Sequence, residues 1–155
     1  MLRQAYRPMA INRQLVDTLP EELGDHLGEH WEAFVEAARE AHLPVPRHPD
    51  FTTSLLRVWA GSEFVAQACI RDPSLLHGLL ESGDLLADYP AGLYPVKLQH
   101  RLGSVRDDES LYRVLREFRL REMVRIAWRD LAGWAPLGEV LDDLSSLADG
   151  FGKYH

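Results

Sequence analysis

EFRLREMVRIAWRDLAG, residues 117–133, combines apolar residues at helical spacing with four arginines between Arg119 and Arg129. No glycine or proline interrupts residues 108–132, so we expect one long helix rather than two. Apolar residues before Leu120 fall on one face of this helix, and those after it fall on the opposite face. Glu122, Arg125 and Arg129 continue the first apolar stripe. The pattern predicts a long helix that presents a polar row.

Start and stop signals divide the rest of the chain into helices, and no stretch reads as a convincing strand. Thr18 and Glu21 are spaced as a capping box that begins a helix running to about His42. The proline-rich residues 43–50 end that helix. Asp50, Asp72 (followed by Pro73) and Asp107 are predicted to cap the N-termini of three further helices, and Asp84 is predicted to cap one additional turn. A break is predicted at Gly61 and Ser62, and a helix end at Gly83. A short helix is expected over residues 96–102, and a last helix over residues 137–147. We expect an all-α fold, an irregular bundle of roughly seven helices, several of them short, with one long arginine-rich helix near the C-terminal end.

Composition favours an ordinary globular protein. The chain has 155 residues, 46% apolar and 26% charged, which is typical of one globular domain. We therefore expect a single helical domain over residues 1–155. Residues 1–17 show only weak periodicity and are expected to be partly loose. A net charge of −7 argues against nucleic acid or an anionic membrane as a partner. Cys69 stands alone and is expected in the core, so no disulfide framework indicates secretion. No signal peptide or membrane span is evident, and a cytoplasmic protein is expected.

One short motif suggests metal chemistry. Residues 26–30, HLGEH, match the H-x-x-E-H pattern, in which two histidines one turn apart bind zinc and the glutamate acts as base. His26, Glu29 and His30 are therefore an alternative metal site. Gly28 weakens the helix, however, and no helix with a further carboxylate ligand is evident. The favoured interpretation is a solvated face without zinc.

The charged row also has two interpretations. Arginine outnumbers lysine fifteen to two, and eight arginines lie between Arg101 and Arg129. Such a cluster is often a solvated helix face. Arginine without lysine, however, suits fixed pairing with carboxylates. We expect Arg125 and Arg129 to pair with acidic residues of other segments, and the candidates are Asp50, Asp72, Asp84, Asp142 and Asp143.

The arginine segment closely resembles the glutamine synthetase adenylyltransferases, bifunctional enzymes that add AMP to glutamine synthetase and remove it. In that family a run of the form R-R-x-R-R-R-E-M-x-R-I-A-x-R-D-L leads towards a nucleotidyltransferase domain. The matching residues here are Arg116, Arg119, Arg121, Glu122, Met123, Arg125, Ile126, Ala127, Arg129, Asp130 and Leu131. Residues 61–85 and 137–149 resemble neighbouring family segments, so the likeness covers residues 51–149. Leu120 departs from the pattern, because the family often has a basic residue there.

The resemblance implies a fragment of a larger enzyme. The family's nucleotidyltransferase motif, G-x-S-D-x-D, supplies carboxylates for magnesium ions that bridge the nucleotide phosphates. No such motif occurs in these 155 residues, so the nucleotidyltransferase domain is absent and no catalytic residue is predicted. We expect the N-terminal helical portion of such an enzyme, inactive alone. ATP and magnesium belong to the parent family, and glutamine synthetase and a PII-class nitrogen signal protein are partners through the parent.

The resemblance also suggests a role for the charged row. We expect Arg121, Glu122, Arg125, Arg129 and Asp130 to form a docking face, directed either at other helices or at the missing nucleotidyltransferase domain. The competing hypothesis is a stand-alone helical interaction module without an enzymatic parent. A zinc hydrolase that uses His26, Glu29 and His30 is the third.

Overall fold

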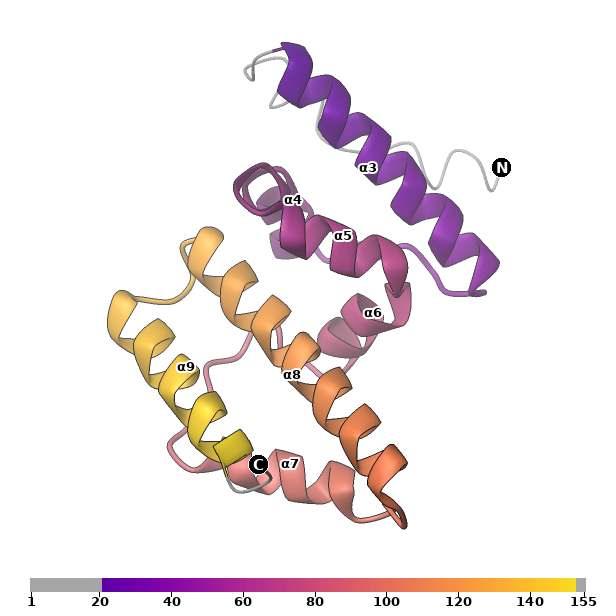
Figure 1. The fold of residues 1–155 in the computed structure, drawn as a ribbon. Helices are drawn as coiled ribbons and strands as arrows, with labels where there is room; N and C mark the ends of the chain where they lie inside the picture. Colours follow the sequence, from indigo (N-terminus) through magenta and orange to yellow (C-terminus); the bar gives the residue numbers. More distant parts are fainter. Residues whose placement is uncertain (1–20, 153–155) are drawn as a thin grey trace. The chain divides into compact units, whose positions relative to one another are not determined.

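The computed structural model describes residues 21–152, and within this range it consists of seven α-helices and no strand (Figure 1). The helices are α3 (Glu21–Glu40), α4 (Pro49–Gly61), α5 (Glu63–Arg71), α6 (Pro73–Glu81), α7 (Leu93–Leu102), α8 (Asp108–Leu131) and α9 (Leu137–Gly152). The prediction of an all-α fold with one long arginine-rich helix is confirmed. The predicted helix start at Thr18 lies outside the described residues, as does the segment 1–17.

The chain divides into two compact units, Met1–Ser82 and Gly83–His155. The first contains α3 to α6, and the second contains α7 to α9. That the whole chain acts as a single domain stays a prediction. No helix within residues 21–152 is long and apolar enough to cross a membrane.

The first unit is held together mainly by aromatic and aliphatic side chains. Trp31 and Phe34 of α3 pack against Trp59 of α4, with ring centroids 6.2 and 5.8 Å from the Trp59 ring. All three side chains are buried. Cys69 of α5 is also fully buried, as predicted, and burial raises the pKa of its thiol. The apolar face of α3 therefore fixes this long helix to its shorter neighbours.

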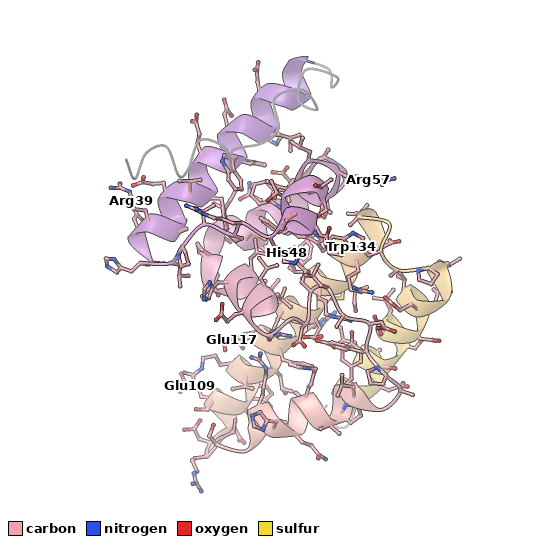
Figure 2. All side chains as sticks on the ribbon, turned by 180° about the vertical axis from the view of Figure 1, so that it is seen from behind. Arg39, His48, Arg57, Glu109, Glu117 and Trp134 are labelled. Carbon is pink, nitrogen blue, oxygen red and sulfur yellow. The ribbon has the colours of Figure 1, made fainter. Side chains whose placement is uncertain are left out.

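Helix boundaries in the first unit follow local capping chemistry. Ser62 Oγ accepts a hydrogen bond from Val65 N, which begins α5, and Asp72 Oδ1 accepts one from Ser74 N at the start of α6. Both boundaries are as predicted. The prediction that Asp50 caps α4 was wrong, because the N-cap is His48, whose Nδ1 accepts from Asp50 N (His48 is labelled in Figure 2). Pro49 takes the first helical position, where its missing N–H and fixed φ carry no penalty.

The second unit has an apolar core between α7, α8 and α9. Its buried members are Tyr94, Leu98, Leu115, Phe118, Ile126, Val140 and Leu147. Asp107 caps α8 by accepting from Ser110 N, and α8 then runs without a break for 24 residues. Glu109 and Glu117 lie on its exposed side (Figure 2). One continuous helix can therefore support an apolar core and a separate polar row.

Two predicted boundaries in the second unit were wrong. Helix α7 begins at Leu93 rather than at Val96, because Gly92 adopts a left-handed φ of 82° that reverses the chain just before the helix. Pro95 is tolerated in the first turn, where no intrahelical N–H bond is required. No helix begins at Asp84. It lies in a hydrogen-bonded turn, in which Ala87 N donates to Asp84 O, and its carboxylate is engaged elsewhere.

Candidate functional site: a buried arginine row and a histidine cluster

Three arginines four residues apart form a row along α8: Arg121, Arg125 and Arg129. All three are buried, and so is Glu122 beside them. The structure thus brings together four of the five residues predicted for the docking face. Asp130 is exposed and lies outside the row. The neighbouring Arg113, Arg116 and Arg119 are also exposed, so burial divides the arginines of one helix into two groups.

Arg125 occupies the centre of the row and has no exposed surface. Its Nε donates to the carbonyl of Asp84 at 2.9 Å, and its Nη2 donates to the carbonyl of Ala87. Its Nη1 pairs with Asp143 Oδ2 of α9 at 3.2 Å and lies 3.4 Å from Tyr94 Oη. The guanidinium also lies over the Tyr89 ring, 3.3 Å from the centroid. Every nitrogen of this buried guanidinium therefore has a partner.

The other two arginines use the same kinds of partner. Arg121 Nη2 pairs with Asp84 Oδ2 at 2.7 Å, and its Nη1 donates to Glu122. Lys97 Nζ reaches the same Asp84 carboxylate at 3.1 Å.

Arg129 pairs with both carboxylate oxygens of Glu139, at 3.1 and 3.3 Å, and donates to the carbonyl of Leu85 at 3.2 Å. Asp84 and Asp143 were among the predicted carboxylate partners. Glu139 was not.

This arrangement explains how an irregular segment can be buried. Residues 83–92 connect α6 to α7 without forming a helix, and Leu85 is fully buried. Buried carbonyls outside regular structure need donors. The arginine row supplies them at three of the four positions from Asp84 to Ala87. We define the buried network as the three arginines and Glu122 of α8 with their partners Asp84, Lys97, Glu139 and Asp143.

Electrostatics differ between the two aspartates of the buried network. Burial alone would raise the pKa of Asp84, but hydrogen bonds from Arg121 and Lys97 outweigh it, so this pKa lies below its ordinary value. Burial raises the pKa of the Asp143 carboxyl, and pairing with Arg125 offsets only part of that effect. Four cationic and four anionic side chains balance each other, which suits a structural role.

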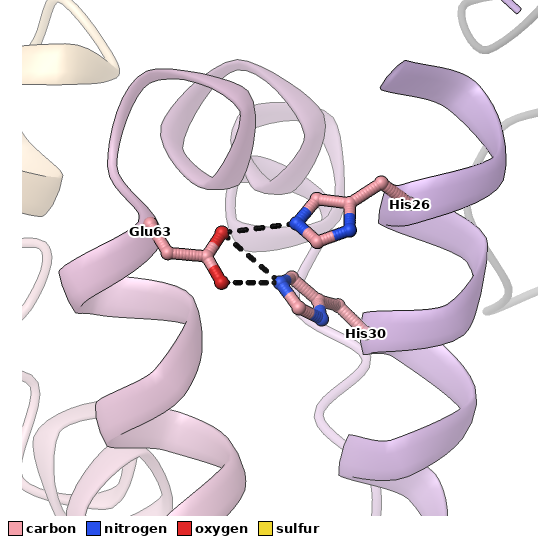
Figure 3. Close-up of side chains that lie close together, drawn as sticks. All are labelled: His26, His30 and Glu63. Carbon is pink, nitrogen blue, oxygen red and sulfur yellow. Dashed lines mark hydrogen bonds and ion pairs between the residues drawn. The ribbon is translucent and has the colours of Figure 1, made fainter. Parts of the chain in front are cut away.

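The second cluster lies in the first unit and involves the H-x-x-E-H motif. His26 and His30 are one turn apart on α3, and both rings point to Glu63 at the start of α5 (Figure 3). His26 Nε2 lies 3.1 Å from Glu63 Oε2, and His30 Nε2 lies 3.0 Å from Glu63 Oε1. Gln67 Nε2 donates to Glu63 Oε1 at 3.1 Å. Hydrogen bonds from Gln67, His30 and His26 lower the pKa of Glu63 to about 2.

Glu29, the motif's own glutamate, is exposed and does not belong to this cluster. In the part of the chain that the structure describes, one group of three or more histidine, cysteine, aspartate or glutamate side chains lies close enough together to share a metal ion. That group is His26, His30 and Glu63. Sequence reasoning missed Glu63, since 33 residues separate it from His30.

Comparison with known proteins gives a consistent result. A sequence model described as "Glutamate-ammonia ligase adenylyltransferase" matches residues 52–151. A protein from Nitrosococcus oceani is 43% identical over 134 residues, which is 86% of this chain and 14% of that protein. Proteins from Thioalkalivibrio sulfidiphilus and Pseudomonas aeruginosa are 39% and 42% identical, over 88% and 76% of this chain and 14% and 12% of their own lengths. All three are named bifunctional glutamine synthetase adenylyltransferase/adenylyl-removing enzyme.

The chain therefore spans about a seventh of the length of these relatives. No solved structure matches it significantly. The matched range contains α5 to α8 entirely, including every arginine of the buried row.

Proposed function

This chain belongs to the glutamate-ammonia ligase adenylyltransferase family, and we propose that it is a non-catalytic helical portion of an enzyme that adds AMP to glutamine synthetase and removes it. The chemistry is carried out by a nucleotidyltransferase domain outside these 155 residues, with ATP and magnesium as that domain's requirements. Glutamine synthetase is the protein modified, and a PII-class nitrogen signal protein acts through the same parent enzyme.

One observation carries the non-catalytic part of the proposal. Three of the five arginines that match the family segment, Arg121, Arg125 and Arg129, are buried and bind carbonyls and carboxylates of their own unit. Arginines that stabilise the charge of a transferred phosphoryl group have to reach a nucleotide. The buried network instead holds residues 84–89 in place, which is a structural contribution to the parent enzyme.

The family match disfavours the stand-alone interaction module, because relatives at about 40% identity over most of the chain are all much longer enzymes. A zinc hydrolase is also disfavoured, because the geometry does not bring Glu29 to the two histidines.

Two measurements test the proposal. The purified chain is incubated with labelled ATP, magnesium and glutamine synthetase, and separately with adenylylated glutamine synthetase, beside the full-length Nitrosococcus oceani relative as a positive control. We expect AMP transfer and removal by the relative and neither by this chain. Transfer that depends on the isolated chain would overturn the non-catalytic role.

The second measurement is the gene sequence that follows the codon for His155. We expect a segment encoding the G-x-S-D-x-D motif in the same or a neighbouring reading frame. Several hundred downstream codons without that motif would contradict the proposal of a parent enzyme.

A further inference from the structure

The cluster of His26, His30 and Glu63 has the donor set and spacing of a transition-metal site. Two imidazole nitrogens and a carboxylate oxygen, one from each side chain, all lie within 4.8 Å of one another. Ligands about 2.0–2.1 Å from a tetrahedral Zn²⁺ are separated by about 3.3 Å. Glu63 Oε2 already lies 3.1 Å from both Nε2 atoms, so two of the three ligand separations are close to those of a zinc site.

The backbone holds these ligands on two helices that already pack together. His26 and His30 share one face of α3 because they are four residues apart. Ser62 caps α5 and thereby places Glu63 in its first turn. Gln67, one turn further along α5, donates to Glu63 and orients its carboxylate, as outer-shell partners commonly do in metal sites.

Exposure distinguishes the three ligands. The His30 side chain is only 10% exposed, whereas His26 and Glu63 are 48% and 56% exposed. The cluster is therefore buried at one ligand and open to solvent at the other two. Two histidines and one glutamate, with a fourth position left to water, form a ligand set that zinc uses in proteins.

We propose that His26, His30 and Glu63 bind one Zn²⁺ ion, which joins α3 to α5 and keeps one coordination position open to solvent. Two imidazoles that converge on one carboxylate exceed what a simple ion pair requires, and an exposed pair of that kind contributes little to stability. The sequence predicted no zinc because no third ligand was evident. Glu63 supplies that ligand.

The test is zinc binding to the untagged, chelator-treated full chain. Zn²⁺ is titrated in competition with a chromophoric chelator, and bound metal is counted by elemental analysis. We expect one Zn²⁺ per chain and a higher melting temperature of the first unit when zinc is present. His26→Ala and Glu63→Gln should each weaken binding at least tenfold, and both side chains are exposed enough for the variants to fold. Cobalt should give the visible absorption of a four-coordinate site.

Matched controls come from the same unit. His77→Ala removes another histidine, one that lies 4.0 Å from Glu81 on α6, and Glu29→Gln removes the glutamate of the sequence motif. Neither side chain belongs to the cluster, so neither substitution should change the zinc affinity by more than about twofold, the usual size of a surface effect. The proposal is overturned if no stoichiometric zinc binds, if His77→Ala weakens binding as much as His26→Ala, or if Glu63→Gln leaves the affinity unchanged. A loss caused by Glu29→Gln alone would restore the sequence motif as the site.

Discussion

The long helices of the two units, α3 and α8, are packed against their neighbours by different kinds of side chain. Helix α3 is held by an apolar face, with Leu27, Trp31 and Phe34 buried against its neighbours. Helix α8 buries Arg121, Arg125 and Arg129 as well as an apolar stripe. Every buried arginine, aspartate and glutamate among the described residues lies in the second unit.

This difference follows from what each helix packs against. The partners of α3 in the first unit are helices, whose own backbone groups are already bonded. The partners of the α8 row include the irregular residues 84–89, whose carbonyls require donors. Buried charges cost desolvation, and an apolar interface of similar volume is often as stable. The buried network thus contributes a defined path for this segment more than it contributes net stability.

The largest loss of stability is expected at Arg125. Arg125→Ala leaves Asp143 and two carbonyls without their donor in a buried position, so it should destabilise the second unit by on the order of 3 kcal/mol. The measurement is urea unfolding of chain labelled with 5-fluorotryptophan. Trp128 and Trp134 report the second unit, and Trp31 and Trp59 report the first.

The control for this variant is Arg113→Ala on the same helix. The Arg113 side chain is 62% exposed and lies 4.0 Å from Glu117, so its loss should cost under about 1 kcal/mol. Equal and small shifts in the urea midpoint for both variants would mean that the row behaves like a solvated face.

A smaller effect is expected at Glu122. This residue has no exposed surface, and within residues 21–152 its Oε1 has no hydrogen-bond partner, while Oε2 accepts from Arg121. Glu122→Gln keeps the volume and removes the charge that balances Arg121, which should cost about 2 kcal/mol. Glu117→Gln, on the exposed side of α8, should change the free energy of unfolding by less than about 0.5 kcal/mol. A neutral result at Glu122 would show that its charge does not support the row.

The smallest substitution effect, and the clearest pH dependence, is expected at Asp84. Because its pKa is lowered in the folded state, the fold binds fewer protons here than the unfolded chain does. Asp84 therefore contributes stability above the ordinary aspartate pKa of about 4, and this contribution is lost as the pH falls through its lower folded value. Asp84→Asn should cost on the order of 1 kcal/mol at pH 7 and flatten the loss of stability in acid.

Asp143 is expected to change the stability with pH in the opposite direction. Its pKa is raised, so the folded state binds more protons, and its ionised form is disfavoured at neutral pH. Asp143→Asn should therefore steepen the acid loss of stability, whereas Asp84→Asn flattens it. Identical pH profiles for the two variants would contradict the assigned electrostatics.

The sequence was informative where local chemistry decides the outcome. Ser62, Asp72 with Pro73, and Asp107 start their helices as predicted, since each cap bonds to a backbone N–H two or three residues away. The continuity of α8 and the common face of Glu122, Arg125 and Arg129 followed from periodicity and from the absence of breakers. These are properties of a few neighbouring residues.

Other features depend on contacts that no local pattern encodes. Glu139 rather than Asp50 or Asp72 pairs with Arg129, because α9 folds back along α8. The carbonyl partners at residues 84–87 carry no sequence signal, since every residue has a carbonyl. Glu63 reaches the two histidines through the packing of α5 on α3. The partners of charged groups are therefore decided by tertiary structure even where burial of one member is predictable.

We infer that the arginine row pairs with charged partners inside its own unit and does not behave as a solvated face. A double-mutant cycle on Arg129 and Glu139 tests it most directly, because this pair has both guanidinium–carboxylate contacts and is mostly buried. The two single alanine variants and the double variant are unfolded in urea with the same fluorine signals, beside a cycle on the exposed pair Arg113 and Glu117. We expect a coupling free energy of about 1 kcal/mol or more for the buried pair and under about 0.5 kcal/mol for the exposed pair. Couplings that agree within about 0.5 kcal/mol would contradict the claim.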